Sequence, residues 1–125
     1  MVKYTIKERK NLKKRAWLVF SKWVRTRDNF TCVTCGKSAP EVMIHAGHFC
    51  HNREDFNPRN VHAQCMGCNW RKKGNMRYYT IRMVEWYGID YVKTLMLCEK
   101  EKPRLESAEF YLDVIVKYIT SEESQ

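Results

Sequence analysis

The chain has 125 residues, of which 44% are hydrophobic, and its 23 Lys and Arg residues outnumber 14 Asp and Glu residues to give a net charge of +9. This length suits one domain, the hydrophobic content excludes a chain that is disordered throughout, and the charge predicts a polyanionic partner, which we expect to be DNA. The sequence shows no signal peptide and no apolar stretch long enough to span a bilayer, so we predict a cytoplasmic protein that contacts no membrane.

The first part of the chain, residues 1–28, is rich in Lys and Arg. Apolar residues recur at helical spacing from Leu12 to Val24, and basic residues occupy the positions between them. This pattern predicts a basic helix over Met1–Arg27 that packs one stripe and shows its other faces to solvent or DNA.

The second part, residues 30–75, contains two cysteine pairs with C-x-x-C spacing, Cys32 with Cys35 and Cys65 with Cys68. Each pair presents two thiolates from one tight turn, and two pairs complete the tetrahedral ligand set of a structural zinc ion. In a reducing cytoplasm such pairs indicate a metal site rather than disulfides. We therefore predict one structural Zn²⁺ and expect the two remaining cysteines to be ordinary thiols.

Between and after the cysteine pairs, the sequence predicts a small α+β element. Apolar, β-prone residues favour strands over Glu41–Phe49 and Asn60–Gln64, joined by a polar loop over residues 51–59. A helix over Cys68–Lys73 is expected to end at Gly74.

In the third part, residues 76–120, the spacing of apolar residues predicts further helices. One covers Met76–Tyr87, a second covers Asp90–Glu99 with Asp90 as its cap, and a final amphipathic helix follows a Ser107 cap. We expect the last helix to supply the interface of a homodimer, if one forms. The apolar residues expected on the inner stripes are Tyr79, Met83 and Trp86 in the first helix and Phe110, Leu112, Val114, Ile115 and Ile119 in the last.

Three residues around the second cysteine pair, His48, Asn60 and Asn69, follow an order that resembles the HNH, or His-Me finger, nucleases. In that family a ββα element supplies a general-base histidine, a middle asparagine and a final metal ligand, often beside a four-cysteine zinc. The resemblance implies an α+β fold with a zinc-stapled, treble-clef-like ββα-metal core surrounded by helices, within one nuclease domain over residues 1–125.

Longer motifs are similar to those of the NinG/Rap recombination endonucleases of lambdoid phages, and the similarity runs from about Arg15 to Glu99. This resemblance implies metal-dependent hydrolysis of phosphodiesters in branched DNA, such as Holliday junctions and D-loops. The motifs are Ala46-Gly47-His48-Phe49, Asn60-Val61-His62-Ala63-Gln64-Cys65, Cys68-Asn69 and Lys73-Gly74-Asn75, followed by Tyr87-Gly88 and Tyr91-Val92.

The chemistry of each residue type agrees with these roles. Deprotonating water near neutral pH suits an imidazole, whose unperturbed pKa is about 6.5, so we assign His48 as the general base. Asn60 is expected to hold the turn and orient His48. Asn69 offers an amide oxygen to a catalytic Mg²⁺ or Mn²⁺ ion, which would neutralise charge on the phosphate.

One position departs from the HNH pattern. Many HNH enzymes carry an Asp metal ligand directly before the base histidine, where this chain has Gly47. We expect His45, three residues before His48, to act at the catalytic site as a metal ligand in its place. Asp55 and His51, on the following loop, are the alternatives.

Basic residues beside these motifs are candidates for contacts with DNA phosphates. Two other functions stay open: a zinc-finger DNA-binding module without catalytic activity, which the glycine before His48 favours, and an HNH nicking endonuclease that acts on duplex DNA. The candidate phosphate contacts are Arg53, Arg59, Arg71, Lys72 and Lys73.

Overall fold

The structure is a computed structural model that describes residues 2–123, with side chains up to residue 119. It has an α+β architecture of helices and a two-stranded sheet. The chain divides into two compact units, one built on the residues up to Trp23 and from Arg104 onward, the other on Val24–Pro103. No helix in the described part is long and apolar enough to cross a membrane.

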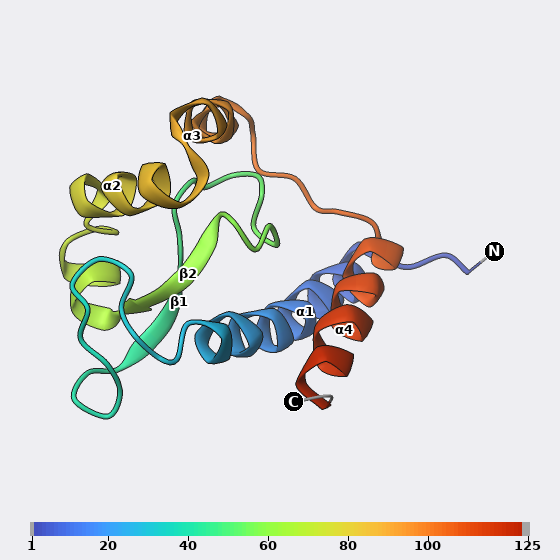
Figure 1. The fold of residues 1–125 in the computed structure, drawn as a ribbon. Helices are drawn as coiled ribbons and strands as arrows, with labels where there is room; N and C mark the ends of the chain where they lie inside the picture. The colour runs from blue at the N-terminus through green and yellow to red at the C-terminus, as the bar shows by residue number, and fades with distance from the viewer. Residues whose placement is uncertain (1, 124–125) are drawn as a thin grey trace. The chain divides into compact units, whose positions relative to one another are not determined.

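The first unit contains most of α1, Ile6–Arg27, and α4, Ala108–Glu123 (Figure 1). The predicted basic helix is thus confirmed, but it begins later than Met1. Thr5 and Glu8 explain the start, because each side chain accepts a hydrogen bond at 3.0 Å from the backbone N–H of the other. This reciprocal capping satisfies donors that have no partner within the helix.

Helix α4 begins as predicted, since Ser107 Oγ accepts a hydrogen bond from the backbone N–H of Phe110 at 3.1 Å. Its inner stripe was predicted only in part. Val114 is buried, but Phe110, Leu112 and Ile119 are 36–40% exposed. The tyrosines at positions 111 and 118 take the inner positions instead, and the ring of the second packs edge-on against Phe20 at 4.8 Å. The ring of Tyr118 fills the space beside Phe20, where the smaller aliphatic side chain of Ile119 would bury less apolar area.

The second unit is organised around strands β1, Ile44–His48, and β2, Val61–Cys65, which pair antiparallel. Ile44 lies opposite Cys65 and His48 lies opposite Val61. Because side chains alternate along a strand, His45 and Gly47 share one face of the sheet with His62 and Gln64, while His48 belongs to the other face. Both predicted strands are confirmed: the first is shorter than predicted, and the second has the predicted length but is shifted by one residue.

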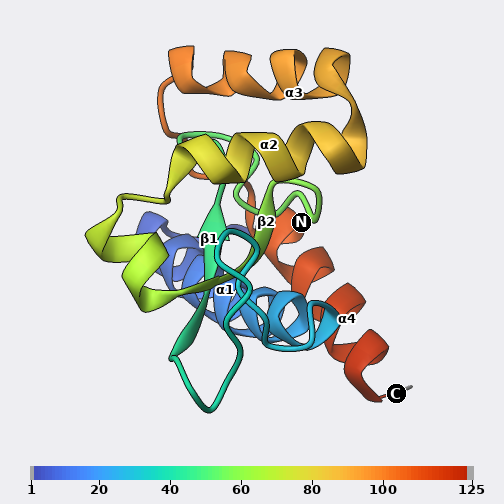
Figure 2. The ribbon, with the colours of Figure 1, turned by 60° about the vertical axis from the view of Figure 1, so that its left-hand side comes forward.

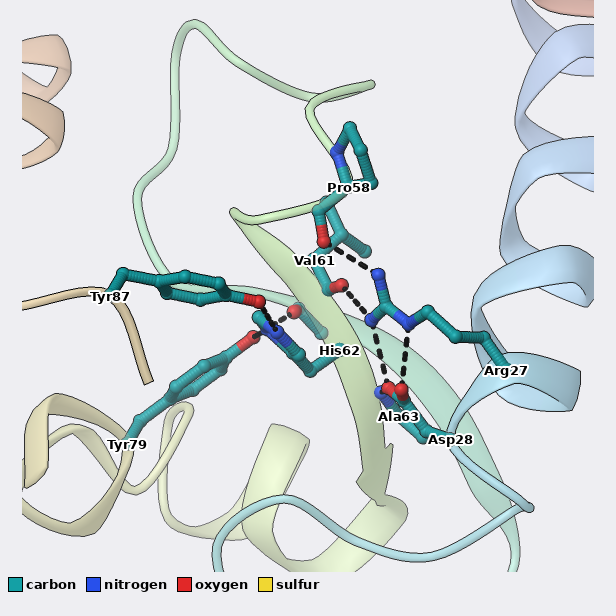
Figure 3. A network of polar contacts seen from close by, with 9 residues as sticks. Arg27, Asp28, Pro58, Val61, His62, Ala63, Tyr79 and Tyr87 are labelled. Atoms are coloured by element: carbon teal, nitrogen blue, oxygen red, sulfur yellow. Dashed lines mark hydrogen bonds and ion pairs between the residues drawn. The ribbon is translucent and has the colours of Figure 1, made fainter. Parts of the chain in front are cut away.

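The outer edge of β2 is covered by the end of α1. Asp28 Oδ2 accepts a hydrogen bond from the backbone N–H of Ala63 at 2.8 Å, and Arg27 donates to the backbone oxygens of Pro58 and Val61 at 2.7 and 2.8 Å (Figure 3). Arg27 also binds the Asp28 carboxylate. An uncovered edge would leave these backbone groups unpaired, so the two side chains close the sheet on this side.

Within the second unit, four helical segments follow β2: η1, Gly67–Arg71; α2, Met76–Tyr87; α3, Ile89–Met96; and η2, Leu97–Lys100. Helices α2 and α3 lie side by side in both views (Figure 1, Figure 2). The bounds of α2 are those predicted. The short segment η1, expected to be an ordinary helix, is a π-helical turn.

Two predictions for these helices are wrong. Asp90 does not cap α3, because the chain turns directly out of α2 at Gly88, where φ is 85°, and the helix begins one residue before Asp90. Trp86 is 51% exposed, although Tyr79 and Met83 are buried as predicted. Tyr87 takes the inner place because its hydroxyl reaches His62 at 2.9 Å.

Candidate functional site

The four predicted zinc ligands come together in the second unit. The Sγ atoms of Cys32, Cys35, Cys65 and Cys68 all lie within 4.8 Å of one another, and those of Cys35 and Cys65 are 3.7 Å apart. Zinc bound tetrahedrally at about 2.3 Å requires sulfurs about 3.8 Å apart. The cluster could therefore hold a metal ion and is compatible with a structural zinc.

Backbone geometry positions each cysteine pair. The backbone N–H of Cys35 donates to Cys32 Sγ, and that of Cys68 donates to Cys65 Sγ, both at 3.4 Å. Gly36 closes the first turn with φ at 79°, a conformation that residues other than glycine seldom adopt. Cys65 is the last residue of β2, so the cluster joins the sheet to η1.

The thiols of the cluster do not ionise alike. Burial opposes ionisation of Cys32, but hydrogen bonds from backbone N–H groups and from the Thr34 hydroxyl outweigh it and lower the pKa of this thiol to about 6. Burial raises the pKa of Cys35 to about 12. Sulfurs this close do not all become thiolates by themselves, so full ionisation of the cluster requires a shared cation.

His48, the predicted base, lies at the end of β1 beside Asp55. Its Nε2 is 3.3 Å from the backbone oxygen of Asp55 and 3.7 Å from the carboxylate oxygen Oδ1. Both side chains are partly open to solvent, at 20% and 32% exposure. The ring of His51, an exposed residue, lies 5.8 Å from that of His48. Asp55, predicted as an alternative metal ligand, thus pairs with the histidine.

Asn60 is fully buried and holds the loop that carries Asp55. Its Oδ1 accepts a hydrogen bond from the backbone N–H of Cys50 at 2.9 Å, and its Nδ2 donates to the backbone oxygens of Cys50 and Glu54 at 2.9 and 3.0 Å. The side chain therefore contacts backbone groups rather than the imidazole of His48. It sets the position of Asp55, and through Asp55 the surroundings of the histidine.

Asn69, the predicted metal ligand in η1, lies next to Gly47. A Cβ built on Gly47 would be 3.2 Å from Asn69 Oδ1 and 2.3 Å from Gln64 Oε1. Asn69 therefore approaches the residue directly before His48, on the opposite face of the strand. His45, the other predicted ligand, shares that face and stands opposite Gln64 in the strand register.

Gln64 belongs to this group but was not singled out from the sequence. A polar residue in a short strand that leads into a cysteine pair gives no indication of burial by itself. Its alternation with His62 along β2 was the only available clue, because a second buried polar residue on the same face calls for a partner.

His62 and two tyrosines of α2 lock the sheet onto that helix. Tyr79 donates to the backbone oxygen of Gly47 at 2.7 Å, so His62 Nδ1 must donate to the Tyr79 hydroxyl, and Nε2 accepts from Tyr87 (Figure 3). Burial, with a smaller effect from Arg27, lowers the pKa of His62 to about 4. This neutral, hydrogen-bonded histidine supports the position of Gly47.

Of the predicted phosphate contacts, four are exposed and one is engaged within the protein. Arg53 donates to the backbone oxygen of Lys102 at 2.9 Å and lies 3.6 Å from the carboxylate of Glu101. Arg59 lies over the rings of Tyr87 and Tyr91, at 5.6 and 5.2 Å. The remaining three lie exposed at the end of η1 and in the turn after it: Arg71, Lys72 and Lys73.

Comparison with known proteins identifies the family to which the chain is similar. The family described as Bacteriophage Lambda NinG protein matches residues 1–121. The protein named ninG of Salmonella phage P22 is 32% identical over 92 residues, which cover 70% of this chain and 45% of that protein. The ninG proteins of Escherichia phage lambda and Escherichia phage 933W are each 30% identical over 95 residues, covering 72% of this chain and 46% and 47% of those proteins.

The chain spans about half the length of these curated relatives. No solved structure shows significant similarity to it. The family match extends over almost every residue, including both cysteine pairs, β1 and β2. The chain therefore belongs to the NinG family of bacteriophage proteins.

Proposed function

We propose that this chain is a metal-dependent endonuclease that hydrolyses phosphodiesters in branched DNA, such as Holliday junctions and D-loops, on a zinc-stapled ββα-metal core. The observation that carries the proposal is the pairing of His48 with Asp55 at the end of β1, one residue from the place where Asn69 Oδ1 approaches the strand. The preference for branched DNA rests on the resemblance to the recombination endonucleases.

His48 would act as the general base. A carbonyl oxygen can only accept a hydrogen bond, so the contact with the backbone of Asp55 favours the tautomer with hydrogen on Nε2, in which Nδ1 is the basic nitrogen. The nearby carboxylate would stabilise the imidazolium. The histidine would take a proton from water, whose oxygen forms a bond to phosphorus while the bond to the leaving oxygen breaks.

A divalent cation would stabilise the negative charge that develops on the phosphate oxygens and the leaving oxygen. Asn69 would bind Mg²⁺ or Mn²⁺ through its amide oxygen, and His45 would be a nitrogen ligand. The amide oxygen fits a hard cation, whereas the imidazole nitrogen is a softer ligand. Both donors are neutral, so negative charge at the site would come from the DNA phosphate. The cysteine cluster would hold zinc for the fold and take no part in the reaction.

DNA would bind to basic residues close to this site. Arg71, Lys72 and Lys73 follow Asn69 directly in the chain and are exposed, and a net charge of +9 favours a polyanion. Lys and Arg side chains neutralise phosphates without reading the base sequence. These contacts would hold the scissile phosphate near His48.

The test is cleavage of labelled four-way junction, flap and linear duplex DNA with Mg²⁺, Mn²⁺ or EDTA. We expect the wild type to cut the junction only with a divalent ion, and His48→Ala to lower the rate about 10²- to 10⁴-fold. His51→Ala removes the neighbouring exposed imidazole and should keep most of the activity. Equal cutting by wild type and His48→Ala, or a loss that follows His51, would refute the assigned base.

A second candidate is a DNA-binding module without catalytic activity, which the glycine in place of an acidic residue before His48 favours. The same assay separates the two. Binding of DNA by a zinc-loaded wild type that cuts none of the substrates with any ion would support the module. Cutting of one strand of the linear duplex, as fast as the junction is cut, would instead indicate a nicking endonuclease.

A further inference from the structure

Gln64 carries a buried acceptor that has no partner. The residue is 0% exposed, and among the side chains that the structure describes its Oε1 is the one buried polar atom without a hydrogen bond. Leaving such an atom unpaired in the protein interior is unfavourable, because it loses its hydrogen bonds to water and gains none in return. An oxygen in this state indicates that a further group belongs beside it.

The orientation of the Gln64 amide is fixed by its other end. Its Nε2 donates to the backbone oxygen of Gly74 at 2.7 Å and to Thr34 Oγ1 at 3.2 Å. Exchanging the nitrogen and oxygen would set two acceptors against each other at Gly74, so the amide cannot be reversed. Oε1 must therefore point toward Gly47.

Gly47 leaves room where Gln64 and Asn69 converge. A Cβ on residue 47 would lie 2.3 Å from Gln64 Oε1 and 3.2 Å from Asn69 Oδ1, so the two amide oxygens approach the same point from β2 and from η1. An aspartate at position 47 would not fit beside this glutamine. The glutamine occupies the space in which that aspartate would present its oxygen.

We propose that Gln64 Oε1 and Asn69 Oδ1 are two ligands of one hard divalent cation, Mg²⁺ or Mn²⁺, bound beside Gly47. Amide oxygens bind such cations in proteins, and the remaining coordination positions are left to water and to phosphate oxygens. The inference rests on the proposed nuclease function and deepens it, because it assigns to Gln64 the role that an acidic residue before the base histidine has in many HNH enzymes.

The neutral charge of the two proposed ligands should affect the Mn²⁺ affinity of the site, which can be measured. Without a carboxylate the site should bind Mn²⁺ weakly in the absence of DNA, and one added negative charge among the ligands should strengthen binding. Asn69 is only partly buried, so Asn69→Asp introduces that charge with little disturbance of the core. Asn11, exposed on α1, provides the matched control, because Asn11→Asp changes the net charge equally.

The experiment is a titration of the zinc-loaded full chain with MnCl₂, in which electron paramagnetic resonance measures free Mn²⁺. We expect Asn69→Asp to bind Mn²⁺ about tenfold more tightly than wild type, and Asn11→Asp to bind as wild type does. Gln64→Met keeps the side-chain length without the oxygen and should weaken binding about tenfold or more. Zinc content and thermal unfolding check that each variant is folded.

Equal Mn²⁺ affinity in Asn69→Asp and Asn11→Asp would overturn the proposal, and so would wild-type affinity in a folded Gln64→Met protein. If Gln64→Met does not fold, the Asn69→Asp comparison decides. The titration contains no DNA, so its failure is distinct from that of the nuclease. Junction cleavage with unchanged Mn²⁺ binding in the variants would refute only the assigned ligands, and the predicted binding without cleavage would refute only the nuclease.

Discussion

The cysteine cluster and the surroundings of Gly47 both lie where β2 meets η1, but their donor atoms differ in charge and in origin. The cluster brings four sulfurs, all anionic when they bind a metal, within 4.8 Å. The other region offers neutral amide oxygens from β2 and η1. Four anionic ligands hold zinc without help, whereas neutral ligands bind a divalent cation only weakly until a bound phosphate adds its negative charge. The first region serves the fold, and the second would act only with substrate.

Removing one sulfur from the cysteine cluster should have the largest effect on the protein. Cys65→Ser replaces a ligand at the end of β2, and we expect it to lose zinc and fold together, because structural zinc in small domains contributes about 10–16 kcal/mol of apparent binding free energy. The measurement is zinc content per chain with circular dichroism. Prolonged treatment of wild type with a strong chelator should have the same effect.

Cys98 is the matched control for this variant, since it is buried in the second unit outside the cluster. The Cys98→Ala protein should keep one zinc per chain and remain folded. A Cys65→Ser protein that retained a full equivalent of zinc would show that the four cysteines do not form the site.

Adding one methyl group at Gly47 should produce the next largest effect. In Gly47→Ala the new Cβ would meet Gln64 at 2.3 Å, and we expect a loss of about 1–3 kcal/mol in the free energy of unfolding, together with weaker Mn²⁺ binding. Denaturant unfolding of the zinc-loaded protein measures the loss. Zinc should stay bound, because the cluster is untouched.

Gly67→Ala is the control for replacing a glycine with alanine, because its new Cβ would meet nothing closer than Cys65 Sγ at 3.9 Å. Combining Gly47→Ala with Gln64→Ala should cost less than the two single variants together, since the clash is removed. Additive costs would mean that Gly47 and Gln64 are not in the contact that the structure shows.

The smallest effect concerns DNA binding beside the Gly47 region. Arg71→Ala and Lys72→Ala should each lower the slope of log affinity against log salt concentration by about one. Arg53→Ala should lower it less, because Arg53 already binds Lys102 and Glu101. Fluorescence anisotropy with labelled DNA at several salt concentrations gives the slopes. An Arg53 effect equal to that of Arg71 would contradict this assignment.

Features that depend on residues close together in the sequence could be predicted, whereas features that depend on residues far apart in the sequence could not. Each cysteine pair is local, and only the meeting of the two pairs had to be inferred, so the cluster was found. The helices and strands could be located because the periodicity of apolar residues is also a local feature of the sequence. Helix α4 carries more than one apolar stripe, and the choice of Tyr118 over Ile119 for the inner face depends on Phe20, nearly one hundred residues earlier.

The candidate catalytic region could be predicted only in part. His48 and Asn69 were chosen from motif order, but the pairing of His48 with Asp55 depends on a loop that Asn60 ties to Cys50 and Glu54. The role inferred for Gln64 depends on contacts with residues from three other segments. No local pattern carries that information.

The most direct test of two distinct metal sites is a crystal of the zinc-loaded protein soaked in MnCl₂, with anomalous scattering recorded near the absorption edges of both metals. Our account predicts zinc among the four cysteine sulfurs and manganese beside Gly47, within bonding distance of Gln64 Oε1 and Asn69 Oδ1. Manganese that bound elsewhere, or a site beside Gly47 without manganese, would contradict it.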